Sequence, residues 1–168
     1  MKKLLFVGVP LLVVLAIAAC SKDDTTTLSI RLTDGPGDFQ QVNVDVQEVL
    51  VKTSGDTSKW LTLSAVPGVY DLLKLQNGVD TLIAVGSLPT VVLKEVRLIL
   101  GTNNTVMVDS VMHNLDTPSA DQSGLKIKVD KKLAATLDNL VLDFDAEKSI
   151  VKKGDGTYSL KPVIKVKN

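Results

Sequence analysis

From residue 28 onward, apolar and polar residues alternate along the chain with a period of two. Leu28, Ile30 and Leu32 share one face of an extended segment, and polar residues lie between them. Because successive side chains of a strand point to opposite faces, this pattern predicts a strand with one buried face. We predict strands at residues 28–33, 42–51, 60–63, 70–75, 81–85, 93–100, 105–109, 125–129, 139–145 and 158–166.

The apolar positions change parity inside the second of these segments. Val42, Val44 and Val46 are followed by Val49 and Val51. A slip of one residue would turn the apolar face to water unless the extra residue is taken up by a β-bulge. The sequence therefore predicts a bulge between Val46 and Val49.

Turn-forming residues separate the predicted strands. Asp34-Gly35-Pro36-Gly37-Asp38 follows the first strand, and residues 53–56 and 152–156 have the composition of hairpin loops. Pro162 lacks an N–H group and predicts an edge strand or a bulge within the last segment. Residues 131–137 are compatible with one or two helical turns. Many short strands divided by turns predict one all-β domain over residues 28–168, an antiparallel β-sandwich with at most one short helix.

The residues before the domain have the pattern of an export signal. Lys2 and Lys3 precede an apolar run over residues 4–19, which is short for a membrane-spanning helix of roughly 20 residues. We therefore predict a signal peptide at residues 1–19. Ile17-Ala18-Ala19-Cys20 resembles the lipobox of bacterial lipoproteins, which implies lipidation of Cys20. The alternative is an ordinary signal peptide followed by a chance cysteine.

Residues 20–27 are polar and small, and we predict a lipidated cysteine followed by a flexible tether. The start Cys20-Ser21-Lys22-Asp23-Asp24 resembles the acidic export signal of surface lipoproteins in Bacteroidetes-type bacteria. The resemblance implies an outer-membrane lipoprotein that faces the outside of the cell. The alternative is that the tether is polar only because tethers generally are.

Composition excludes several classes of function. The chain has 168 residues, one Cys, one His, and 19 basic against 19 acidic side chains; without residues 1–19 the balance is 17 against 19. A neutral to mildly acidic protein lacks the charge footprint of a nucleic-acid-binding protein. One Cys and one His exclude a Cys-based zinc cage and a multi-His metal site. No phosphate-loop or dinucleotide-binding pattern is present, so we expect no cofactor.

Two groups of polar residues invite a chemical interpretation. His113 lies near Asp109 and Ser110, but triad members normally come from separate elements, so we predict no catalytic residue. Oxygen ligands for calcium could come from four carboxylates, although the spacing of an EF-hand is missing and we predict no metal site. These weak calcium candidates are Asp34, Asp38, Asp143 and Asp145.

Aromatic residues are few, and two of them could bind a ligand. Trp60 and Tyr70 are the pair that could form a stacking platform for a sugar, provided that both rings are exposed in one groove. The alternative is that they fill the core of a small β domain.

Six segments spread along the chain carry a resemblance to a known family. They are Leu32-Thr33-Asp34-Gly35-Pro36-Gly37-Asp38-Phe39, Tyr70-Asp71-Leu72-Leu73, Arg97-Leu98-Ile99-Leu100, Ser123-Gly124-Leu125-Lys126, Leu142-Asp143-Phe144-Asp145 and Leu160-Lys161-Pro162-Val163-Ile164. Together they resemble a family of bacterial lipoprotein domains catalogued as domain-of-unknown-function family 4382. The resemblance implies a prealbumin-like, carboxypeptidase-regulatory-like or immunoglobulin-like β-sandwich, and it carries over no catalytic residue. One departure is Thr90-Val91, where the family often has Ala-Gly, so a tight turn there is in doubt.

These observations favour a non-catalytic binding or structural module, held at the membrane through Cys20, with a glycan or an envelope protein as its partner. The first alternative is a carbohydrate-binding accessory protein for glycan capture, for which Trp60 and Tyr70 would share a groove. A hydrolytic enzyme is the weaker alternative, and it would bring His113 together with a carboxylate and a serine in a pocket.

Overall fold

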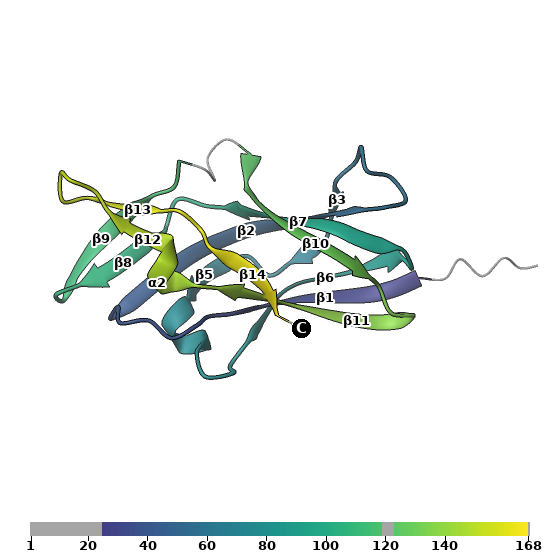
Figure 1. Ribbon diagram of the computed structural model, residues 1–168, viewed down its shortest axis with the longest axis horizontal. Helices are drawn as coiled ribbons and strands as arrows, with labels where there is room; N and C mark the ends of the chain where they lie inside the picture. Colours follow the sequence, from purple (N-terminus) through teal and green to yellow (C-terminus); the bar gives the residue numbers. More distant parts are fainter. Residues whose placement is uncertain (1–24, 119–122, 168) are drawn as a thin grey trace, which may run out of the picture.

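Two packed β-sheets make up the computed structural model, which describes residues 25–118 and 123–167 (Figure 1). Over these residues the first sheet has the strand order β14-β11-β1-β6-β4. Its strands are β1 (Thr25–Thr33), β4 (Ser64–Ala65), β6 (Thr81–Pro89), β11 (Thr136–Phe144) and β14 (Ile164–Lys167).

The second sheet has the order β10-β7-β2-β8-β9-β13-β12 over the same residues, and β3 and β5 also pair with β2. Two short helices complete the described fold, the 3-10 helix η1 (Leu72–Leu75) and the α-helix α2 (Ala146–Ser149). The strands of this sheet are β2 (Gln41–Thr53), β3 (Leu61–Thr62), β5 (Gly68–Asp71), β7 (Val92–Leu100), β8 (Thr105–Val108), β9 (Val111–Asp116), β10 (Leu125–Lys132), β12 (Ile150–Lys152) and β13 (Tyr158–Leu160).

The predicted β-sandwich with one short α-helix is confirmed, but its sheets are mixed rather than purely antiparallel. β1 pairs with β11 in parallel over eight residue pairs, from Thr26–Thr136 to Thr33–Asp143, and β9 pairs with β13 in parallel. A parallel pair needs a long connection between its strands. Here more than a hundred residues separate β1 from β11, so the alternation of single strands could not reveal the pairing.

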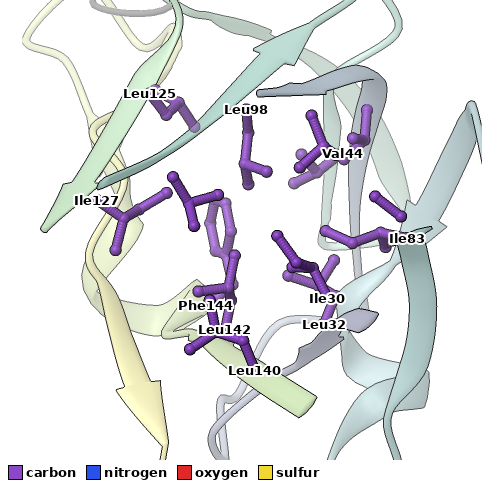
Figure 2. Packing of buried hydrophobic residues seen from close by; sticks show 14 of the residues in the cluster. Ile30, Leu32, Val44, Ile83, Leu98, Leu125, Ile127, Leu140, Leu142 and Phe144 are labelled. Atoms are coloured by element: carbon purple, nitrogen blue, oxygen red, sulfur yellow. The ribbon is translucent and has the colours of Figure 1, made fainter. Parts of the chain in front are cut away.

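The core lies between the two sheets and is formed by the positions that alternation assigned to it. Leu28, Ile30 and Leu32 of β1 are fully buried, as are the valines of β2. Figure 2 shows Ile30, Leu32 and Phe144 of the first sheet packed in one cluster with residues of the second sheet, Val44, Leu98 and Ile127. The predicted bulge is confirmed, because the pairing of β2 with β7 shifts register between Val46 and Glu48.

Three predicted segments differ from the structure. Residues 131–137 are not helical, because β10 continues to Lys132 and the carboxylate of Asp138 accepts a hydrogen bond from Ala134 N (2.8 Å), which holds a loop there. The segment 70–75 is a strand only to Asp71, whose side chain then caps η1. The segment 158–166 divides into β13 and β14 at residues 161–163, as Pro162 allowed.

Three further details refine the predicted boundaries. β1 begins at Thr25, so residues 25–27 of the expected tether belong to the sheet, and the buried Thr26 donates a hydrogen bond to Ala134 O (2.6 Å). The hairpin loops at residues 53–56 and 152–156 are confirmed. Thr90 and Val91 form the short connection between β6 and β7.

Asp45 on β2 anchors the loop that connects β7 to β8. Its side chain is buried, and one carboxylate oxygen accepts hydrogen bonds from Asn103 N (3.1 Å) and Asn103 Nδ2 (3.0 Å). Its backbone N–H donates to Asn104 Oδ1 (2.9 Å), and its carbonyl accepts from Gly101 N (2.8 Å). A Cβ on Gly101 would lie 2.3 Å from Asp45 Oδ2, so this close approach requires glycine.

We expect Asp45→Ala to lower the free energy of unfolding by about 2–3 kcal/mol, because the donors of Asn103 lose a charged acceptor in a buried place. Asp45→Asn keeps an acceptor oxygen and should lose less. Urea unfolding measures both. Equal losses for the two variants would contradict this account of the loop.

Candidate functional site

Trp60 stands at the start of β3 on the outer face of the second sheet, under two cations. The guanidinium carbon of Arg97 lies 3.9 Å from the centre of its ring, and Lys52 Nζ lies 4.7 Å from it. Both distances are in the range of cation–π attraction. The indole is half-buried, and the contacts fix its position instead of leaving a bare ring.

Tyr70 lies at a different place and belongs to the core side of the same sheet. It stands opposite the buried Val44 on β2, packs against the core, and donates a hydrogen bond to Val66 O. Burial raises the pKa of its hydroxyl. Trp60 lies beside the other end of β2, where β3 pairs with Leu50 and Val51, roughly 20 Å away along the strand.

The structure therefore does not bring Trp60 and Tyr70 into one groove. The alternation of β2 could not show this, because the two aromatics lie outside that strand and the bulge reverses which face its residues present.

The outer face around Trp60 is basic. In the register of the sheet, Arg97 stands between Leu50 and Lys126, and Glu95 stands between Lys52 and Lys128. Four cations thus surround one carboxylate on three neighbouring strands. Within the described residues, none of the four has a carboxylate within 4.0 Å. We define the basic face as Lys52, Trp60, Arg97, Lys126 and Lys128.

The weak calcium candidates differ in their surroundings, and two of them have a structural role. Asp34 is buried and accepts hydrogen bonds from Ala146 N (2.9 Å) and Gln76 Nε2 (3.2 Å), so it joins the first loop to α2 and to the segment after η1. Asp145 caps α2 and also pairs with Lys148, whose hydrogen bond lowers the pKa of Asp145. Asp38 is exposed.

Asp143 lies near Asp34, and its Oδ1 atom is buried without a hydrogen-bond partner in the described part of the chain. Burial raises the pKa of Asp34, and the negative charge of Asp143 adds to this rise, although the donors from Ala146 and Gln76 oppose it. Residues 25–118 and 123–167 hold no group of three or more His, Cys, Asp or Glu side chains that could bind a metal ion.

His113 packs against Tyr158, with ring centres 4.9 Å apart. Asp109 and Ser110 form the two-residue turn between β8 and β9 and both have positive φ values, 50° and 63°. Such a turn suits a tight hairpin and explains these residues. The three side chains that could have suggested a triad thus have separate structural roles.

Two earlier expectations fall on other parts of the chain. Cys20 and the signal peptide lie outside the described residues. Within the described residues, no helix is long and apolar enough to span a membrane.

Comparison with known proteins adds a family but no activity. The family model for a domain of unknown function, DUF4382, matches residues 25–162. The chain belongs to the DUF4382 family. No curated protein and no solved structure matches it. The matched range includes Asp34 and both of the residues that donate hydrogen bonds to it, Gln76 and Ala146.

Asp34→Asn tests the cost of burying this carboxyl group. Its pKa in the folded chain lies above the ordinary value of 3.8, so the folded state binds more protons between the two values. The free energy of unfolding therefore falls as the pH rises through that window. Asn can still accept from Ala146 N but carries no charge. We expect the variant to gain stability relative to the unmodified chain as the pH rises, with urea unfolding at several pH values as the measurement.

Asp138→Asn is the control with the opposite sign. Burial opposes ionisation of Asp138, but the hydrogen bonds from Lys131 Nζ (2.7 Å) and Ala134 N (2.8 Å) outweigh it and lower the pKa of the carboxyl. Its ionised form therefore stabilises the fold above the unfolded pKa, and this stability is lost as the pH falls through the folded pKa. The Asp138 variant should be less stable than the unmodified chain at pH 7. The same pH trend in both variants would contradict the assignment.

Proposed function

We propose that this DUF4382 chain is an envelope lipoprotein, anchored to the outer membrane through acyl chains on Cys20 and facing outward, whose β-sandwich is a non-catalytic binding module. The acidic tether after Cys20 supports the outward orientation. Two or more acyl chains give stable anchoring, because each buried methylene contributes about 0.8 kcal/mol.

The observation that carries the binding proposal is the basic face. Four cations gather on the outer surface of three neighbouring strands: Lys52, Arg97, Lys126 and Lys128. The chain without residues 1–19 is not basic overall, because it has 17 basic against 19 acidic side chains. Clustered cations without carboxylate partners attract anionic groups and speed encounter with them. An anionic partner is therefore the class of ligand that this face fits.

A carbohydrate remains the second candidate, and Trp60 is the observation that favours it. Its ring is only half-buried, and the cations on either side would suit an acidic sugar better than a neutral one. The arrangement offers one aromatic ring rather than the two-ring platform that the sequence suggested.

Cys20→Ser tests the anchor. We expect this change to leave the chain unprocessed or to release it from the membrane fraction, because the serine hydroxyl cannot form the thioether with lipid. Ser21→Ala is the control and should remain membrane-bound. Fractionation and labelling with a fatty-acid analogue measure the outcome. Continued acyl labelling of the Ser variant at the level of the control would contradict the proposed anchor.

Binding of anionic polymers tests the basic face. Polyglutamate and polygalacturonate are the anionic probes, and dextran and polylysine are the neutral and basic ones. We expect the anionic probes to bind and to weaken from about 50 mM to about 200 mM salt. Lys52→Gln/Arg97→Gln should weaken binding about fivefold or more.

The matched control is Lys74→Gln/Lys152→Gln, which removes the same charge from two exposed lysines outside the basic face and should bind as the unmodified chain does. Circular dichroism checks that all variants fold. If both double variants weaken binding of the anionic probes equally, the proposed role of this face is wrong. If dextran binds as well as the anionic probes do, stacking of a neutral sugar on Trp60 is favoured.

A further inference from the structure

We infer that the free edge of β10 binds an extended segment of a partner protein in which apolar and acidic residues alternate. The inference rests on the proposed function, since it names the partner class and the place where a binding module would hold it. It concerns a cleft that borders the basic face at Lys126.

A cleft of about 370 Å³ lies between β10 and the segment that leads from β13 into β14. Residues 124–127 line one of its walls. The last three of these residues belong to β10. Because successive side chains of a strand point to opposite faces, three consecutive residues can line one cleft only along the edge of the strand. β10 is the last strand of its sheet and pairs only with β7 within the described residues. The outward N–H and C=O groups of β10 therefore face the cleft.

On the opposite wall, the backbone N–H groups of residues 161–163 are already used or absent. Lys161 N donates to Ser149 O (2.8 Å), and Val163 N donates to Ser149 Oγ (2.8 Å). Val163 O accepts from Asp145 N (3.0 Å), and Pro162 has no N–H. This wall is thus tied to α2 and offers β10 no strand to pair with. An extended segment in the cleft would therefore pair as a strand with β10.

The end of the cleft is held in place by Gly124. Its φ is +70°, and a Cβ there would lie 2.8 Å from Leu98 O and 2.6 Å from Ile99 Cδ1. The chain therefore enters β10 in close contact with β7, in a conformation that favours glycine.

The side chains along the cleft define the sequence of the incoming segment. Leu125 and Ile127 point toward the core side, and Ile164 faces them from β14. Lys126 and Lys161 are exposed and have no carboxylate within 4.0 Å in the described residues. A strand added to β10 would place every second side chain near the apolar residues and the others near Lys126, so apolar residues would alternate with Asp or Glu.

The same lysines disfavour a second copy of this chain as the occupant. Two β10 edges in contact would bring Lys126 and Lys128 close to their equivalents, and like charges on neighbouring strands repel. If β14 of a second copy lay along β10 instead, its exposed Lys165 and Lys167 would also repel the lysines of β10. Lysine on a free edge normally prevents strand addition, and here it would admit an acidic strand selectively.

The test uses the intact chain with Cys20→Ser and an alternating Glu–Val octapeptide as the probe. We expect nuclear magnetic resonance shift changes at residues 124–127 and 161–164, with interchain contacts between peptide α-protons and β10 amides. Lys126→Gln/Lys161→Gln should weaken binding about tenfold or more, while Lys74→Gln/Lys152→Gln should leave it unchanged. The alternating Lys–Val octapeptide should not bind.

Each other outcome overturns the inference in a distinguishable way. Peptide contacts at Trp60 and Arg97 without contacts at β10 would leave the binding module standing and reject the edge. If polygalacturonate displaces the peptide and causes the same resonance shift changes at residues 124–127, the cleft binds an acidic glycan and the peptide assignment is wrong. Failure of the peptide to bind a chain that binds polyglutamate would reject strand addition alone, and failure of both would reject the proposed function as well.

Discussion

The two sheets of this protein are joined along one side and left open along the other, and most of its properties depend on that asymmetry. On the joined side the chain passes from β3 to β4 and on to β5, and so from one sheet to the other and back within residues 61–71. On the open side the edge strands β10 and β14 belong to different sheets, and within the described residues they do not pair with each other. The fold thus leaves the edge of β10 available beside an apolar core.

Buried aspartates hold the loops around this core through hydrogen bonds to other segments. Asp34 connects the first loop to α2, and Asp45 fixes the loop between β7 and β8. Each carboxylate is buried, so each gains stability from its hydrogen bonds and loses some through desolvation. For Asp34 desolvation and the nearby Asp143 dominate, whereas for Asp138 the donors do. Two of the four weak calcium candidates have structural roles, because Asp34 belongs to such a connection and Asp145 caps α2.

Local physics made most of the strands and the bulge predictable, since alternation and its slip between Val46 and Val49 are properties of neighbouring residues. β9 and β12 were not predicted. The pairing of strands was not predictable, because β1 meets β11 only through contacts between distant segments. The 3-10 helix after Asp71 and the loop at residues 133–135 were missed for a related reason. In both, an aspartate side chain accepts a backbone N–H and so competes with regular structure.

The candidate site was predictable only in part. The sequence singled out Trp60, but its cations come from β2 and β7, and only the sheet register places them over the ring. The cleft has walls more than thirty residues apart in the chain. The one local signal for it was the alternating lysines of β10 and β14. The alternating pattern indicated only that these lysines face solvent.

Residue-resolved amide hydrogen exchange of the free protein tests the open edge most directly. If β10 is an uncovered edge, the amides of β10 should alternate between slow exchange, where they bond to β7, and fast exchange, where they face the cleft. The amides of β1, which has a neighbour on each side, should all exchange slowly. Uniformly slow exchange along β10 would show that its edge is already paired and would contradict the account.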